Sequence, residues 1–238
     1  MMIWRKGITV RVFYRPKTIY NTERMALEMK VLFLNGSPHK DGCGARALKE
    51  MQSIFEAEGI ETETVHVGAM NIHGCKACLA CYKLGKCVFD DVVNEIAEKF
   101  EGADGLVVSS PIYYAAPNAT LVALLDRMFY SSAFDKTMKV GASVVTARRG
   151  GCTAGFDVLN KYFYISGMPI ASGQYWNQVH GAVAEDAEED LEGLQSMRTL
   201  ARNMSFLMKS IAIGKEKFGL PEKEGKIRTN FIKRPKKL

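Results

Sequence analysis

Long apolar runs are missing from this 238-residue sequence, although 47% of its residues are hydrophobic. No stretch approaches the ~20 apolar residues that cross a bilayer. The first residues, Met1–Lys6, also lack the apolar core of a signal peptide. We therefore expect no membrane association and a cytoplasmic location. The chain is long enough to bury a full hydrophobic core, and its length favours one domain with appendages.

A second absence concerns the loop after the first apolar strand, residues 30–35. The loop, residues 36–44, carries several glycines and leads into a helical pattern. Backbone N–H groups and the positive end of a helix dipole then converge on one spot that suits a phosphate. No Lys-Ser or Lys-Thr follows Gly42, which excludes the loop that binds nucleoside triphosphates.

The dinucleotide-binding pattern is incomplete as well. Residues 42–47 match its glycine spacing with alanine last, but the first glycine lies well beyond the strand end. The next strand, residues 61–67, ends without the acidic residue that binds a ribose. A long loop around one phosphate suits flavin mononucleotide (FMN) better, with the Ser37 hydroxyl as a further donor. An ordinary turn rich in glycine and proline is the alternative interpretation.

Strand and helix patterns alternate along the rest of the chain. Strands are predicted near residues 105–109, 140–146 and 169–172, and helices at 92–100, 118–130 and 156–165. Repeated units of this kind predict an α/β fold, a doubly wound five-stranded parallel sheet with helices on both faces. In such a sheet the ligand lies at the carboxyl ends of the strands.

Two more loops leave those carboxyl ends. Residues 109–118 place aromatic rings beside a turn, which offers a flat ligand a stacking surface and backbone amides. Residues 146–152 hold two arginines and two glycines, and guanidinium groups suit an electron-rich ring carbonyl or a phosphate. Each loop alone has a structural explanation, but their shared edge favours a common ligand.

Four of the six cysteines, Cys75, Cys78, Cys81 and Cys87, lie in one short segment with the spacing C-x2-C-x2-C-x5-C. Compact spacing is typical of iron–sulfur ligation, whereas zinc ribbons supply two separated pairs. Three interpretations stay open: a [4Fe-4S] cluster, four reduced thiols in a loop, and a zinc or redox-thiol site. A disulfide framework is disfavoured in a reducing cytosol.

Both ends of the chain are basic. Residues 1–29 carry six Lys or Arg against two Asp or Glu, and residues 222–238 carry seven against two. Few aromatic residues are interleaved with these charges, so we expect solvated ends and no nucleic-acid partner.

The strand–helix alternation divides the chain into three parts. Residues 1–28 lie outside it and are predicted to be an N-terminal extension, either a mobile arm or a segment before a natural start at Met29. Residues 29–182 form the predicted FMN-binding domain, and residues 183–238 a C-terminal helix and basic tail. Within 185–213 an apolar stripe at helical spacing favours packing across a subunit boundary about as much as packing on the core.

With these motifs in place, the chain resembles the NADPH-dependent FMN reductase and iron–sulfur flavoprotein group of the flavodoxin-like fold, over about residues 29–232. The segments that carry the resemblance are residues 35–38, 78–81 with 85–91, 110–114, 125–127 and 174–181. The resemblance implies FMN with its phosphate at the first loop and its ring between the second and third. It also implies assembly as a homodimer or homotetramer.

The resemblance further implies a role for individual residues. Ser37, His39, Cys43, Gly44 and Ala45 would hold the phosphate; Pro111, Ile112, Tyr113, Tyr114 and Asn118 the ring; and Arg148, Arg149, Gly150 and Gly151 its other side. Gly44 stands where a threonine is common in the family, which removes one hydroxyl donor and keeps the backbone donor.

These observations predict an FMN-dependent NAD(P)H oxidoreductase. NADPH or NADH would deliver hydride to FMN, and a small-molecule or protein acceptor would take the electrons. The alternative is an iron–sulfur flavoprotein that carries electrons between protein partners. No dedicated acid or base is predicted, and for His180 a packing role is favoured over proton transfer.

Overall fold

The structure, a computed structural model, describes residues 28–225, 227 and 229 of the chain. The predicted N-terminal extension, apart from Glu28, and most of the basic tail lie outside these residues. The strands are β1 (Met29–Asn35), β2 (Ile60–His66), β3 (Gly105–Tyr113), β4 (Ala116–Pro117), β5 (Val140–Ala147) and β6 (Gln178–His180). The helices are α1 (Cys43–Ala57), α2 (Cys81–Leu84), α3 (Val92–Glu101), α4 (Ala119–Ser131), α5 (Cys152–Ile165), α6 (Ala184–Glu189) and α7 (Leu191–Phe218).

The sheet has the strand order β2-β1-β3-β5-β6, and each neighbouring pair along this path is parallel. The short strand β4 pairs with the end of β3 in an antiparallel hairpin. This confirms the predicted α/β fold with five parallel strands. Counted along the chain without β4, the order is 2-1-3-4-5, that of doubly wound flavodoxin-like sheets.

The fifth strand lies later in the chain than predicted. Residues 169–172 form only an isolated bridge between Ile170 and Gly141, and the strand itself is β6. The Gly141 N–H donates to the Pro169 carbonyl and the Ala171 N–H donates to the Gly141 carbonyl, both over 2.8 Å, and the chain then leaves the sheet. It returns where the Val145 N–H donates to the Asn177 carbonyl over 3.0 Å.

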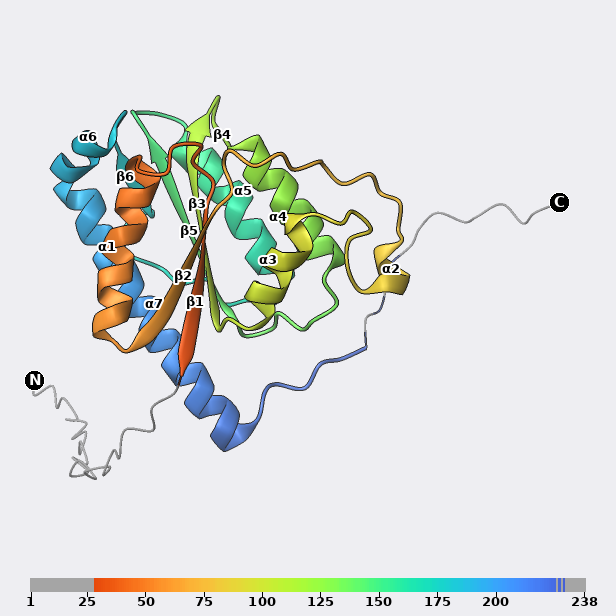
Figure 1. Cartoon of the computed structure of the whole chain (residues 1–238). Helices are drawn as coiled ribbons and strands as arrows, with labels where there is room; N and C mark the ends of the chain where they lie inside the picture. The colour runs from red at the N-terminus through yellow and green to blue at the C-terminus, as the bar shows by residue number, and fades with distance from the viewer. Residues whose placement is uncertain (1–27, 226, 228, 230–238) are drawn as a thin grey trace, which may run out of the picture.

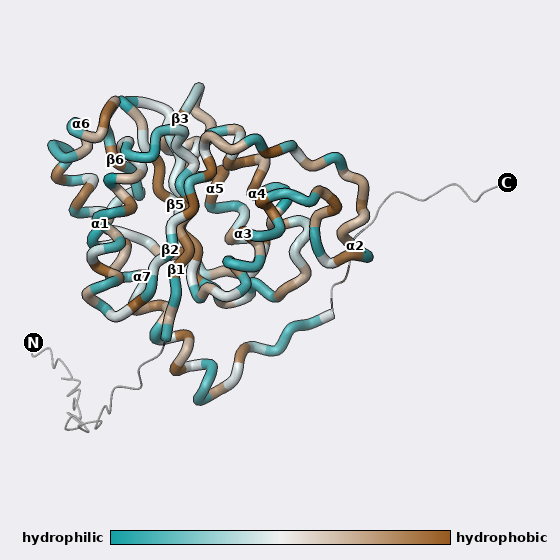
Figure 2. Tube along the Cα trace, in the orientation of Figure 1, coloured by the Kyte–Doolittle hydropathy of each residue, from teal (hydrophilic) through white to brown (hydrophobic). Residues whose placement is uncertain are grey.

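Helices cover both faces of the sheet (Figure 1). α1, α6 and α7 lie on one face, and α3, α4 and α5 lie on the other. In β1, Val31 and Phe33 belong to the core on the first face, while Leu32 and Leu34 belong to the core on the second. Hydrophobic residues accordingly mark the central strands in Figure 2. Burial on both faces explains the continuous apolar run in this strand.

The predicted helical stretch 185–213 is two helices, because Asp190 interrupts it. Asp190 lies outside both helices and its carboxylate accepts the Gly193 N–H over 2.9 Å, which starts α7. The apolar stripe of α7 is buried in the same core as α1, with Met197 and Met204 fully buried. Of the two partners that the sequence left open for this stripe, the structure shows the chain's own core. Within the described part of the chain, none of the helices combines the length and apolarity of a membrane span.

Candidate functional site

Three loops leave the carboxyl edge of the sheet, where the strand ends lie side by side. Asn35 at the end of β1 pairs with Ser109 of β3, and Pro111 of β3 pairs with Thr146 of β5. The loops that follow β1, β3 and β5 therefore converge at one edge, the upper one in Figure 1. Ligands of doubly wound sheets bind in the crevice at this edge.

The loop after β1 packs tightly against β3 before α1 begins. The Gly36 N–H donates to the Ser109 carbonyl over 2.7 Å, and the Ser37 N–H donates to Asn35 Oδ1 over 3.0 Å. A Cβ on Gly44 would lie 3.1 Å from Ser109 Oγ, a buried hydroxyl that has no hydrogen-bond partner among the described residues. Gly44, which has no side chain, and the unpartnered Ser109 hydroxyl thus lie together at the first turn of α1.

The first turn of α1 is open to an anion. The helix begins at Cys43 after Gly42, which supplies no side-chain cap, and the turn holds no acidic residue. The Cys43 thiol donates to the Val183 carbonyl over 3.0 Å, and burial raises its pKa, so Cys43 offers a ligand its backbone N–H. Ser37 Oγ accepts the His39 N–H over 3.2 Å, which leaves the hydroxyl proton free for a ligand.

The second loop is a tight β-hairpin. Tyr113 pairs with Ala116, and the turn residues Tyr114 (φ 49°) and Ala115 (φ 61°) are left-handed. This conformation costs roughly 1–3 kcal/mol for a residue other than glycine and is typical of ligand-binding turns. The Tyr114 ring is fully exposed at the tip. Asn118 ends the loop, where its Oδ1 accepts two N–H groups from the first turn of α4, so its amide NH2 remains available.

Two glycines lie close against the hairpin, Gly151 at the end of the third loop and Gly155 in α5. Gly151 has φ 89°, and a Cβ there would lie 3.0 Å from the backbone of the hairpin tip. Ile112 of the hairpin fills the space above Gly155, which has no room for a side chain. Arg148 and Arg149 are exposed beside this contact. The structure therefore brings the predicted residues of all three loops to one edge.

This edge combines an uncapped helix start with an aromatic hairpin and an arginine-bearing loop. The sequence profile of the family described as NADPH-dependent FMN reductase matches residues 29–181, which include all three loops. The chain belongs to the NADPH-dependent FMN reductase family. Membership confirms the resemblance seen in the sequence and the flavoprotein class that it implies.

Individual relatives agree with the FMN reductase assignment. An iron–sulfur flavoprotein of Methanosarcina thermophila is 31% identical over 193 residues, which cover 79% of this chain and 100% of that protein. A structure of RosB with the bound intermediate 8-demethyl-8-formylriboflavin-5'-phosphate has a TM-score of 0.61 at 15% identity, covering 88% of this chain and 98% of RosB. A flavodoxin from the domain Archaea has a TM-score of 0.51 at 11% identity, covering 76% and 99%. The two structures confirm the flavodoxin-like fold.

The cysteines of this FMN reductase family member lie away from the three loops. Cys75, Cys78, Cys81 and Cys87 line one hollow together with Arg127 of α4. In Figure 1 the chain after β2 runs from the sheet edge outward to α2. The first residue of α2, Cys81, lines this hollow. Arg127 lies eight residues beyond the start of α4, a rise of about 12 Å along the helix. The structure thus groups the four cysteines and separates them from the flavin-family loops.

The cysteine segment contains two residues with a left-handed backbone conformation and a backbone hydrogen bond to a sulfur atom. Ala77 (φ 51°) and Leu79 (φ 60°) are both left-handed, and the Ala77 N–H donates to Cys75 Sγ over 3.4 Å. Strain of this kind in residues other than glycine clusters at functional sites. Within the described residues the thiols are not gathered into a metal-binding group, so a cluster would have to draw them together. Four sulfur donors around one hollow fit iron–sulfur ligation by donor type.

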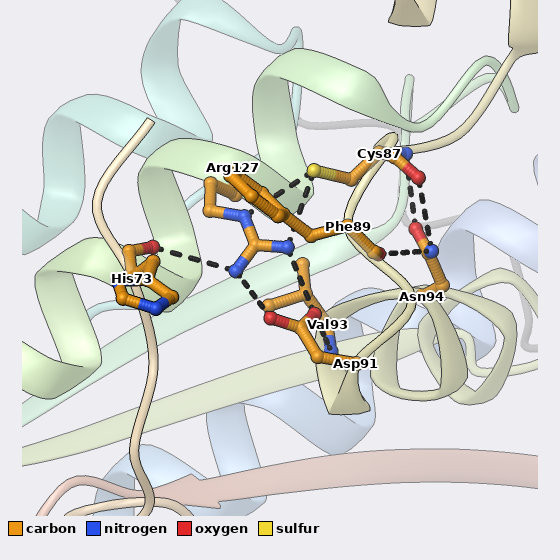
Figure 3. Close-up of polar contacts among 7 residues, drawn as sticks. All are labelled: His73, Cys87, Phe89, Asp91, Val93, Asn94 and Arg127. Atoms are coloured by element: carbon orange, nitrogen blue, oxygen red, sulfur yellow. Dashed lines mark hydrogen bonds and ion pairs between the residues drawn. The ribbon is translucent and has the colours of Figure 1, made fainter. Parts of the chain in front are cut away.

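Arg127, which lines this hollow, forms an ion pair with Asp91, for which the sequence alone suggested no role (Figure 3). The Arg127 side chain is 1% exposed, and its guanidinium donates to the two Asp91 carboxylate oxygens over 2.7 and 2.8 Å. These hydrogen bonds hold the pKa of Asp91 below its usual value. The available signal was an arginine within the mostly apolar stretch 119–131.

Proposed function

We propose that this chain is an FMN-dependent oxidoreductase that takes electrons from NADPH or NADH and passes them to a small-molecule or protein acceptor. One observation carries the proposal: three loops converge at the carboxyl edge of the sheet, and the helix after the first of them starts without a cap. Membership in the FMN reductase family supports it.

The phosphate of FMN would bind at the start of α1. An uncapped helix start offers free backbone N–H groups and a positive dipole end, and both favour a dianion. The Ser37 hydroxyl proton adds a donor, and His39 of the same loop is exposed. The proposed phosphate-binding residues are Ser37, His39, Cys43, Gly44 and Ala45.

The isoalloxazine ring would lie between the hairpin and the third loop. The exposed rings of Tyr113 and Tyr114 offer a flat apolar surface, and the free amide NH2 of Asn118 offers a donor. The proposed ring-binding residues are Pro111, Ile112, Tyr113, Tyr114 and Asn118 from the hairpin and Arg148, Arg149, Gly150 and Gly151 from the third loop. Gly151 packs directly against the hairpin tip, so the two loops that would hold the ring are in contact with each other.

Bound FMN supplies the redox chemistry, because its ring accepts a hydride from a reduced nicotinamide and passes two electrons on. The chain holds the ring, keeps one face open to both reactants and places positive charge beside it. The exposed guanidiniums of Arg148 and Arg149 suit a ring carbonyl that gains negative charge, or the phosphates of the incoming nicotinamide cofactor. No side chain at this edge is assigned as an acid or a base.

The cysteine hollow favours a second candidate, an electron carrier in which a [4Fe-4S] cluster exchanges electrons with FMN. The proposed cluster ligands are Cys75, Cys78, Cys81 and Cys87. The strained segment around them and the name of the relative from Methanosarcina thermophila support this candidate. The two candidates differ in the electron donor, which is a nicotinamide in the first and a protein in the second.

Cofactor analysis tests both candidates. Heat-denatured protein should release FMN on chromatography, and FAD would contradict a site built for one phosphate. Iron and sulfide assays on protein kept without oxygen should give about four of each per chain. FMN without iron would remove the cluster and leave the reductase proposal standing. Iron with an FMN that neither NADPH nor NADH reduces would favour the electron carrier.

A further inference from the structure

One sulfur of the cysteine segment faces a buried cation. Arg127 Nε and Nη2 donate to Cys87 Sγ over 3.3 and 3.2 Å, and the Arg127 side chain is 1% exposed (Figure 3). Charge-assisted N–H groups bond most strongly to an acceptor that carries negative charge. Cys87 therefore has a partner suited to a charged sulfur ligand, whereas Cys75 and Cys78 are exposed.

Asp91 fixes the direction of that guanidinium. Its carboxylate occupies the Nη1 and Nη2 edge at 2.7 and 2.8 Å, which leaves the Nε and Nη2 edge for Cys87. Asp91 is fixed in turn, because its Oδ1 accepts the Val93 N–H at the start of α3 over 3.2 Å. With the His73 carbonyl at 3.4 Å, the guanidinium makes five hydrogen bonds, as many as it has donors.

Asn94 holds the backbone of Cys87. Its Oδ1 accepts the Cys87 N–H over 3.0 Å, and its Nδ2 donates to the Cys87 and Phe89 carbonyls over 3.1 and 3.0 Å. The Phe89 ring covers the guanidinium, with its centroid 4.9 Å from Arg127 Cζ. Residues of α3 and α4 thus hold both the backbone and the sulfur of Cys87, independently of the other three cysteines.

We propose that Arg127 is a positioning residue for the iron–sulfur cluster, which holds Cys87 as the anchored ligand and raises the reduction potential of the cluster. The inference rests on the cluster in the proposed function. Hydrogen bonds to a ligand sulfur and nearby positive charge stabilise the more negative, reduced cluster. Outer groups that orient a ligand also strengthen metal retention. Asp91 acts through Arg127, by fixing the direction of its donors.

Three variants of the whole chain, prepared without oxygen, test this role. Arg127→Lys keeps the positive charge but loses the guanidinium, which donates to Cys87 from one edge and to Asp91 from the other. Asp91→Asn keeps the shape of the side chain and weakens its hydrogen bonds with the Arg127 guanidinium. Arg198→Lys is the matched control, because Arg198 also pairs with a carboxylate, that of Glu50, on the opposite face of the sheet.

We expect Arg127→Lys to hold iron roughly 10- to 100-fold less tightly than the wild type against an iron chelator. Its remaining cluster should have a more negative reduction potential in a spectroscopic redox titration. Asp91→Asn should shift both quantities in the same direction by less, and Arg198→Lys should shift neither. The FMN potential in the same titration should stay constant, because Arg127 lies away from the three loops.

Wild-type iron retention and cluster potential in both Arg127→Lys and Asp91→Asn would overturn the inference. Equal losses in Arg198→Lys would also overturn it, because they would indicate a general effect of stability. If Arg127→Lys does not fold, as judged by the loss of its FMN, Asp91→Asn decides alone. A wild-type protein with FMN and no iron would instead contradict the proposed cluster, and with it this inference, while the FMN site would stand.

Discussion

Gly155 of α5 lies directly beneath Ile112 of the hairpin, so closely that a Cβ on Gly155 would overlap Ile112 Cδ1. This contact joins the second loop to the helix that follows the third. A helical position without a side chain thus contacts a residue of the proposed ring site.

Replacing Gly155 by alanine should displace the Ile112 side chain and weaken FMN binding. The free energy of unfolding should fall by less than the ~1–3 kcal/mol that overpacking usually costs, because the overlapped atom is the free end of the Ile112 side chain, which can move. Flavin fluorescence titration and urea unfolding measure the two effects. Gly214→Ala in α7 is the control, because a Cβ there meets nothing within 4 Å, and it should gain up to about 1 kcal/mol from helix propensity. Unchanged FMN affinity in Gly155→Ala would show that Ile112 of the hairpin does not contribute to flavin binding.

Replacing Ser37 by alanine should weaken FMN binding by about 1–2 kcal/mol, the usual cost of losing a hydrogen bond to a charged group. The change also removes the acceptor of the His39 N–H, which loosens the loop. Ser53→Ala, on the exposed side of α1, is the control and should bind FMN as the wild type does. Equal affinities in all three proteins would show that the Ser37 hydroxyl does not reach the phosphate.

Glu50 makes the stability of the chain depend on pH. Burial opposes its ionisation, but hydrogen bonds from Arg198 of α7 and Arg46 of α1 outweigh burial and hold its pKa below its usual value. A lowered pKa contributes stability that is present above the unfolded-state pKa of ~4.3 and is lost as the pH falls through the folded-state value.

Glu50→Gln should therefore lower the free energy of unfolding at pH 7 by about 1–3 kcal/mol. The difference from the wild type should shrink as the pH falls below about 4. Urea unfolding at several pH values measures it. Glu56→Gln, at an exposed position of the same helix, is the control and should show little difference at any pH. A gap between Glu50→Gln and the wild type that stays constant with pH would contradict the ion-pair explanation.

We expect the chain to assemble at least as a dimer. Tyr164 and Ile165 at the end of α5 are 82% and 86% exposed, and neighbouring exposed apolar side chains are typical of surfaces that pair. Light scattering at micromolar concentration measures the mass. A monomer fully loaded with FMN would show that the site needs no second subunit.

Elements with a strong local pattern were predictable from the sequence. The apolar run of β1 and the glycines after it indicate a buried strand and a tight loop, and the structure has both. The strand near residues 169–172 was misplaced, because the position of the fifth strand depends on its pairing with β5, which is known only in the fold. The apolar stripe of α7 has the same spacing whether its partner is the chain's own core or another subunit, so the sequence could not distinguish them.

Contacts between distant residues were out of reach. Arg127 lies in α4 and Asp91, 36 residues earlier, lies just before α3, and nothing local in either segment points to the other. The spacing of the cysteines indicated their chemistry, yet it gave no information on the residue that faces Cys87. The shared edge of the three loops could be expected from the sequence. In a parallel sheet the carboxyl ends of all strands lie at the same edge, so the loops that follow them lie there too.

Anaerobic titration of the purified protein with NADPH, followed at the absorption band of the flavin, tests the central claim most directly. The account predicts that the band bleaches and that about one NADPH per FMN completes the change, because one hydride carries two electrons. It also predicts that an added electron acceptor restores the band. An FMN that dithionite bleaches, and that neither NADPH nor NADH reduces, would contradict the assignment as a nicotinamide-dependent oxidoreductase.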